Sequence, residues 1–149
     1  AYGDIDEANS SIGISVAYSS EKTKATLLKI QNDLFDIGAD LCFPEKKKIK
    51  LTVKTDSINL LEKEIDRMNE SLSKLESFIL PGGSKASSFL HLSRSLVRRA
   101  ERSVVHLNEK EYVNPDILKY VNRLSDFLFV AARFENRQVG DILWVPNKN

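Results

Sequence analysis

The sequence is organised around residues 80–102, which read LPGGSKASSFLHLSRSLVRRAER. A Pro-Gly-Gly break, typical of a turn, is followed at once by residues with helical periodicity, and Ser84 is placed as the N-cap of that helix. Arg94, Arg98 and Arg102 are spaced four residues apart, so they lie on one face of the predicted helix. We therefore expect a long helix that carries a row of three guanidinium groups, called the arginine stripe below.

The arginine stripe concentrates positive charge in a chain that is nearly neutral overall. The chain has 22 Lys and Arg against 21 Asp and Glu, whereas residues 81–102 hold five basic side chains and one acid. Each like-charged pair one turn apart costs about 0.2–0.5 kcal/mol, so the stripe favours a bound polyanion or facing carboxylates. A guanidinium group can donate two parallel hydrogen bonds to two oxygens of one phosphate, which favours a phosphate-binding site. A solvated helix face or an intersubunit salt-bridge ladder is the alternative.

Outward from this helix, the chain reads as five helical segments, and no segment is a convincing strand. The first spans about residues 4–18, the second follows Ser19-Ser20 as a capping signal, and the third begins near Thr55-Asp56. The fourth follows Ser84 to about residue 108, and the fifth begins with Asn114 as N-cap and Pro115 at its first position. Such lengths with short connections predict an all-α fold, a five-helix up-and-down bundle.

Apolar residues recur at helical spacing, and we expect them to face the core. In chain order they are Ile5, Ala8, Ile12, Val16, Leu27, Leu28, Leu34, Ile37, Leu41, Ile58, Leu61, Ile65, Met68, Leu72, Leu118, Val121, Leu124, Leu128 and Ala132. Two segments fall outside this pattern. The run Pro44-Glu45-Lys46-Lys47-Lys48 is predicted to be a solvated loop, and residues 141–149 a non-helical strap or a partly disordered tail.

Length and composition restrict the class of protein. At 149 residues and 42% hydrophobic content, residues 1–149 are expected to form one domain. Cys42 is the single cysteine, which excludes an internal disulfide and a thiolate zinc cluster and fits the reducing cytoplasm. No apolar run approaches the roughly 18–20 residues that span a bilayer, and no secretory signal is evident. The near-neutral balance argues against a protein that coats nucleic acid.

Three further groups are candidates for a site. Asn122 and Asp126 share one face of the fifth helix, with Arg133 two turns on; they form either a ligand site or a structural network. Asp6 belongs to an acidic helix start, where it either complements the helix dipole or orients an arginine. Phe78 precedes the Pro-Gly-Gly turn and either packs in the core or lines the site.

Several enzyme classes are disfavoured. Neither His91 nor His106 follows a Glu in Glu-x-x-His spacing, which argues against a di-iron bundle. H-E-x-x-H and G-x-S-x-G are absent, so no protein metal site and no serine nucleophile are predicted. The Glu-x-x-Glu pairs of an all-α nucleotide pyrophosphatase are also missing after Glu62 and Glu109.

Several strings resemble the PduO-type ATP:cob(I)alamin adenosyltransferases. They are Leu80-Pro-Gly-Gly-Ser-Lys-Ala, Arg98-Arg-Ala-Glu-Arg102, Val121-Asn-Arg-Leu-Ser-Asp-Phe-Leu-Phe129 and Ala132-Arg133. The start, Ala1-Tyr-Gly-Asp-Ile-Asp-Glu-Ala-Asn9, resembles the first-helix motif of the same family. These strings occur in the family's order and span almost the whole chain.

The resemblance implies transfer of the 5′-deoxyadenosyl group of ATP, bound with Mg²⁺, to the cobalt of cob(I)alamin. It implies a homotrimer with active sites between subunits, with a reductase and an adenosylcobalamin-dependent acceptor enzyme as further partners. Composition and charge add the expectation of a cytoplasmic protein that binds neither nucleic acid nor membrane. Asp6 is expected to reach across the interface to Arg98, and both are predicted to be catalytic. Phe78 is expected to face the corrin ring and help exclude the lower axial base. The implied ATP-binding residues are Arg94, Arg98, Arg99, Glu101, Arg102 and Asn122.

The family normally carries a Thr-x-x-Gly-Asp-x-Gly segment ahead of its first helix, which wraps the phosphates. The sequence given starts after the position of that segment. A gene that encodes no such segment would favour the alternative function, a catalytically inactive binding or regulatory module with the same helical bundle.

Overall fold

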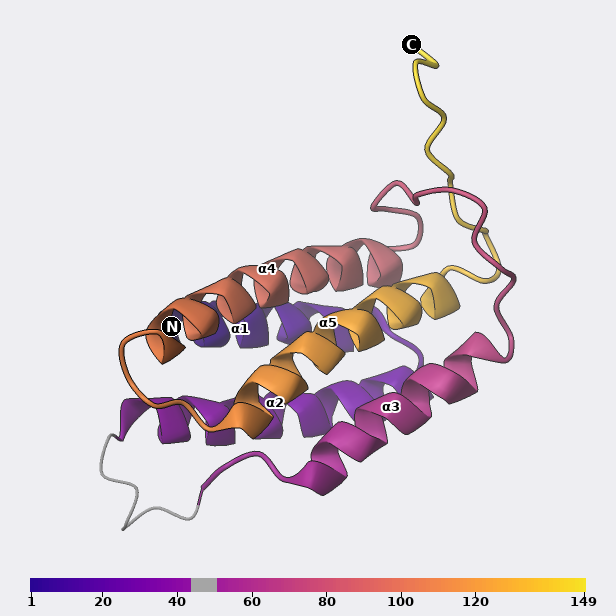
Figure 1. Cartoon of the computed structure of the whole chain (residues 1–149). Coiled ribbons are helices and arrows are strands. Elements are labelled where there is room, and N and C mark those ends of the chain that lie inside the picture. Colours follow the sequence, from indigo (N-terminus) through magenta and orange to yellow (C-terminus); the bar gives the residue numbers. More distant parts are fainter. Residues whose placement is uncertain (44–50) are drawn as a thin grey trace.

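The part of the chain that the structure describes folds as five helices, as the sequence predicted (Figure 1). The structure, a computed structural model, describes residues 1–43 and 51–149. The helices are α1 (Tyr2–Tyr18), α2 (Glu21–Cys42), α3 (Thr55–Asn69), α4 (Lys85–Asn108) and α5 (Pro115–Glu135). The lysine run predicted to be a loop lies in residues 44–50, outside the described residues. Within the described residues no strand forms, and residues Ile79 and Leu143 make an isolated antiparallel bridge.

Successive helices run antiparallel, which gives the up-and-down arrangement (Figure 1). Helix α4 packs against α1 and α5, while α2 packs against α1 and α3 packs against α5. Within the described part of the chain, no helix is both long enough and apolar enough to cross a bilayer.

Two predicted N-caps fix where α4 and α5 begin. The Ser84 hydroxyl accepts a hydrogen bond from the backbone N–H of Ser87, at 3.1 Å. The Asn114 side chain accepts one from the backbone N–H of Asp116, at 3.0 Å, and Pro115 occupies the first turn without losing a hydrogen bond. Both caps predicted from the sequence are confirmed, and they set the register of the two helices that carry most of the site.

The prediction that a serine side chain caps α2 is wrong, although the predicted start of the helix is right. The helix does begin after Ser20, but the Ser20 side chain makes no cap hydrogen bond. Its hydroxyl instead donates to the Glu135 carboxylate at the end of α5, at 2.6 Å, and its backbone N–H donates to the same oxygen. A charged acceptor forms the stronger hydrogen bond, so Ser20 ties the α1–α2 turn to α5.

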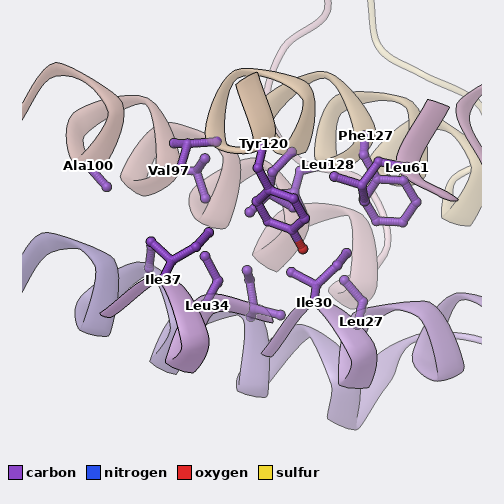
Figure 2. Close-up of a cluster of buried hydrophobic side chains, with 14 of the residues drawn as sticks. Leu27, Ile30, Leu34, Ile37, Leu61, Val97, Ala100, Tyr120, Phe127 and Leu128 are labelled. Carbon is purple, nitrogen blue, oxygen red and sulfur yellow. The ribbon is translucent and has the colours of Figure 1, made fainter. Parts of the chain in front are cut away.

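The core lies between α2 on one side and α4 and α5 on the other. Figure 2 shows Leu27, Leu34 and Ile37 of α2 directed toward side chains of α4, α5 and α3. The prediction that Leu28 belongs to this stripe is wrong, because its side chain is 45% exposed. Adjacent residues point about 100° apart on an α-helix, and on α2 the direction of Leu27 is the one that faces the core.

One polar group crosses this core. The buried Tyr120 hydroxyl of α5 donates to Asp33 of α2, at 2.8 Å, and Ser57 of α3 donates to the other oxygen of that carboxylate, at 3.2 Å. Burial raises the pKa of Asp33, although both hydrogen bonds act to lower it. Burial also raises the pKa of Tyr120, with a further contribution from the Asp33 charge. Three helices are therefore joined at one half-buried carboxylate.

Replacing Tyr120 by Phe is expected to destabilise the fold by about 1–3 kcal/mol. The substitution removes one of the two side-chain hydrogen bonds to the Asp33 carboxylate, which stays partly buried. The loss should appear as a lower midpoint of urea unfolding with an unchanged slope. Tyr2→Phe, which removes a hydroxyl from a half-exposed ring, is the matched control. Equal stability of the two variants would contradict a structural role for the Asp33 hydrogen bond.

Candidate active site

The arginine stripe lies along α4 as predicted, and its charges are not neutralised within the described residues. Arg94 is half-buried, and Arg98 and Arg102 are exposed. Among residues 1–43 and 51–149, none of the three forms an ion pair with a carboxylate, and the buried Nε of Arg94 has no hydrogen-bond partner. Burial, followed by the positive charge of Arg98, lowers the pKa of Arg94. The unpaired guanidinium groups of the stripe can therefore bind an anion.

Arg99 points elsewhere, although it is adjacent to the stripe in the sequence. Its guanidinium pairs with Glu7 and lies 3.6 Å from an Asp4 carboxylate oxygen, and both acids belong to α1. Asp4 also accepts a hydrogen bond from the Ser103 hydroxyl. These contacts fasten α1 to α4, so the structure places Arg99 apart from Arg94, Arg98 and Arg102.

Asp6 is separated from the other acids of α1. Its side chain is exposed and makes no ion pair or side-chain hydrogen bond within the described part of the chain. The structure therefore does not bring Asp6 to an arginine of the same chain, and its carboxylate stays accessible to another molecule.

Glu101 and Asn122 are brought together across α4 and α5. The Asn122 amide donates to the Glu101 carboxylate, at 2.8 Å. The other residues considered with Asn122 lie in separate contacts: Asp126 pairs with Arg123 of its own helix, and Arg133 pairs with Asp141 beyond the helix end. The predicted network of Asn122, Asp126 and Arg133 does not form, because each of these residues bonds to a different neighbour. The four-residue spacing of Asn122 and Asp126 does not bring them into contact with a shared partner among the described residues.

An apolar cavity of about 690 Å³ adjoins the stripe at Arg94. It is lined by Leu75, Glu76, Ser77, Phe78, Ile79, His91, Arg94, Phe129 and Trp144. The Phe78 ring is 77% exposed and packs against Trp144 with the ring centroids 5.8 Å apart. A smaller hollow of about 310 Å³ lies at the other end of the stripe, beside Glu101, Arg102 and His106. The guanidinium groups thus run from the apolar cavity at Arg94 to a second hollow at Arg102.

His91 and Trp144 were not identified as site residues from the sequence. His91 is 2% exposed, and neither of its ring nitrogens has a hydrogen-bond partner within the described residues. Burial, and then the charge of Arg94, lowers its pKa, so the imidazole is neutral at pH 7. Its spacing of three residues from Arg94 was the available signal. Trp144 belongs to the predicted non-helical tail, and only the folded structure brings it to Phe78.

The described part of the chain is an all-α bundle with unpaired arginines beside an apolar cavity. These features define a binding protein or an enzyme whose ligands include an anionic group, for the arginines, and an apolar group, for the cavity. The family profile described as "Cobalamin adenosyltransferase" matches residues 1–135. The chain belongs to this cobalamin adenosyltransferase family, which confirms the resemblance seen in the sequence.

Curated relatives agree with this assignment. The chain is 46% identical over 150 residues to a corrinoid adenosyltransferase of Bacillus subtilis, with 95% of this chain and 77% of the relative aligned. It is 45% identical to a corrinoid adenosyltransferase of Mycobacterium tuberculosis H37Rv, covering 98% of this chain and 79% of the relative. It is 37% identical to the corrinoid adenosyltransferase PduO of Salmonella typhimurium, covering 91% of this chain and 41% of the relative.

A solved structure shares the fold. A variant of the PduO-type ATP:corrinoid adenosyltransferase from Lactobacillus reuteri, complexed with cobalamin and ATP, superposes with a TM-score of 0.91. The two sequences are 36% identical, and the match covers 97% of this chain and 82% of that chain. At this identity and coverage, the helical arrangement seen here is that of the family.

Proposed function

We propose that the protein is an ATP:corrinoid adenosyltransferase that transfers the 5′-deoxyadenosyl group of ATP to the cobalt of cob(I)alamin. The observation that carries the proposal is the arginine stripe, unpaired within the described residues, beside an apolar cavity in a chain of this family. The stripe suits a triphosphate and the cavity suits a corrin ring. Residues 1–149 would act as one adenosyltransferase domain.

The nucleotide is assigned to α4 and α5. Arg94, Arg98 and Arg102 would bind phosphate oxygens, since guanidinium forks bind them in pairs. The Glu101–Asn122 hydrogen bond, at 2.8 Å, joins the two helices at this site and would fix both side chains for contact with the nucleotide. For Arg99, contact with ATP stays a prediction, and it would require the side chain to leave Asp4 and Glu7.

Chemistry at this site needs positioning and charge stabilisation rather than a nucleophilic side chain. Cobalt(I) donates an electron pair to C5′ of the ribose as the C5′–O bond breaks, and the oxygen leaves with its electron pair as triphosphate. Guanidinium groups stabilise the negative charge that grows on the leaving oxygen. Residues held on one rigid helix also keep the reacting atoms in line.

Magnesium is expected to enter with the nucleotide. Within residues 1–43 and 51–149, no group of three or more His, Cys, Asp or Glu side chains could hold a metal ion. Mg²⁺ commonly binds through substrate phosphates and keeps several waters, so a protein cage is not required. The ion would neutralise part of the triphosphate charge that the arginines do not.

The cavity is assigned to the corrinoid. Its aromatic wall, formed by Phe78, Phe129 and Trp144, offers flat apolar surface to the corrin ring. Phe78 would occupy the lower axial side of the cobalt and exclude its axial base. His91, buried and neutral, would present unpaired nitrogens to the amide side chains of the corrinoid, because buried polar atoms need partners.

A homotrimer with active sites between subunits would complete the site. Asp6 and Arg98 are both exposed and both lack an ion pair within the described residues. An Asp6 carboxylate of one subunit and the Arg98 guanidinium of its neighbour would therefore satisfy each other and orient the fork. A cytoplasmic location, a reductase that supplies cob(I)alamin and an enzyme that accepts adenosylcobalamin complete the proposal.

The test is a spectroscopic assay of the protein with MgATP and chemically reduced cob(I)alamin. We expect the cobalt(I) absorption to be replaced by that of adenosylcobalamin, with one triphosphate released for each turnover. Calorimetry with MgATP alone serves as an independent measure of nucleotide binding. ATP binding without turnover would favour the inactive binding module, and the absence of both binding and turnover would refute the assignment.

A further inference from the structure

The C-terminal segment 141–145, called the strap below, pairs with residues 77–80 on the loop before α4. The pairing is made by backbone and side-chain hydrogen bonds and by the bridge between Ile79 and Leu143. The bonds run from Trp144 N–H to Phe78 O (2.7 Å), from Leu80 N–H to Ile142 O (2.8 Å) and from the Ser77 hydroxyl to Trp144 O (2.9 Å). The strap therefore contacts the backbone on both sides of Phe78.

The Phe78 side chain is largely exposed. Its side chain is 77% exposed, and its ring packs against Trp144 of the strap, with the centroids 5.8 Å apart and an interplanar angle of 59°. An exposed aromatic ring on a loop gains little from burial, so its position depends on the backbone that carries it. That backbone is fixed by the strap.

The strap is held in turn by a buried group at the end of α5. The Arg133 guanidinium, with its side chain 8% exposed, donates to Asp141 at 3.1 Å and to the Ser73 carbonyl at 2.8 Å. The Asn136 amide, 2% exposed, donates to the other Asp141 oxygen at 3.1 Å and also to the Gly140 carbonyl. Both oxygens of the carboxylate that opens the strap are thus bonded by buried donors of α5 and its C-cap.

We propose that Arg133, Asn136 and Asp141 act as a clamp that positions Phe78, through the strap, for the corrinoid reaction. The clamp residues are positioning residues and do not themselves touch the reacting atoms. This inference rests on the proposed function, because it names the step that Phe78 serves. Since a reacting geometry is sensitive to displacements of about 1 Å, a loosened strap should impair use of the corrinoid while nucleotide binding on α4 is retained.

The chain offers a direct reporter of the strap, because Trp144 is its single tryptophan. Replacing Asp141 by Ala should shift the Trp144 emission to longer wavelength and increase its quenching by acrylamide, with no change in helix content by circular dichroism. The KM for cob(I)alamin should rise about tenfold, the change expected on losing hydrogen bonds to a charged group, and the KM for ATP should stay within about twofold. Asp141→Asn keeps acceptor capacity and should give intermediate values.

Asp116→Asn is the matched control, because it removes a carboxylate charge from the opposite end of α5 and leaves the strap untouched. Unchanged Trp144 emission in Asp141→Ala would overturn the clamp. A shifted emission with an unchanged corrinoid KM, or with equal changes for corrinoid and ATP, would overturn its positioning role. If wild-type protein has no turnover, the proposed function fails, while the substrate-free Trp144 measurement still supports or overturns the clamp.

Discussion

Arg98→Ala should reduce turnover of cob(I)alamin and MgATP by about 10²–10³-fold, the loss typical of removing one donor that stabilises a developing negative charge. Arg98 is the central member of the stripe, exposed and without an ion pair within the described residues, so under the proposed function its charge would act on the leaving triphosphate. The fall should lie mainly in kcat, because the charge on the leaving oxygen is larger in the transition state than in bound ATP. Stopped-flow spectroscopy at saturating substrates measures it.

Stability should change in the opposite direction. Removing Arg98 relieves like-charge contacts with Arg94 and Arg102, each worth about 0.2–0.5 kcal/mol, so the unfolding free energy should be equal or slightly higher. Arg98→Lys keeps the charge but loses the fork and should recover part of the rate. Lys119→Ala, which removes an exposed lysine with one weak ion pair, is the control. Wild-type turnover in Arg98→Ala would refute the role assigned to this residue.

Phe78→Ala should lower the rate of adenosylation by about 10²-fold when the reaction starts from cob(II)alamin and a reductant, equivalent to about 2.7 kcal/mol of barrier. Without the ring, the lower axial base can remain on the cobalt, which makes the metal harder to reduce. The absorption spectrum of bound cob(II)alamin should therefore keep its base-on form, while the KM for ATP is unchanged. Because the ring is 77% exposed, its removal should have little effect on the midpoint of urea unfolding.

Phe43→Ala is a matched control, since it removes an exposed phenyl ring at the C-terminal end of α2. It should leave the rate and the cob(II)alamin spectrum unaltered. Phe78→Trp, which keeps a large aromatic ring, should retain more activity than Phe78→Ala. A base-off spectrum in Phe78→Ala would contradict the proposed exclusion of the axial base even if the rate falls.

The helices were predictable because their signals are local. The Ser84 and Asn114 caps and the proline at the start of α5 mark helix starts within a few residues of sequence, and the structure confirms them. The arginine stripe follows from helical periodicity alone. Periodicity does not say which of two adjacent apolar residues faces the core when both fit the pattern. The prediction that Leu28 is buried is therefore wrong, although the prediction that Leu27 is buried is correct.

The aromatic cavity was not predictable, because its walls come from distant parts of the chain. Phe78 and Trp144 are 66 positions apart, and they meet through backbone hydrogen bonds that leave no pattern in side-chain type. The separate orientation of Arg99 depends likewise on Asp4 and Glu7, which reach α4 only once α1 is packed. Local sequence sets which groups a helix presents, and tertiary packing determines which of them are neutralised.

Asn136 has a consequence for how the chain tolerates insertions. Its side-chain oxygen accepts from the backbone N–H of Ser84, where α4 begins, and its amide group donates to Asp141, where the strap begins. Gly83 has a φ of +104°, and a Cβ there would clash with the same amide. One extra residue between 136 and 141 would leave all five helices intact and yet shift the strap out of register, so the spacing of this short connection is under tighter constraint than its exposed surface suggests.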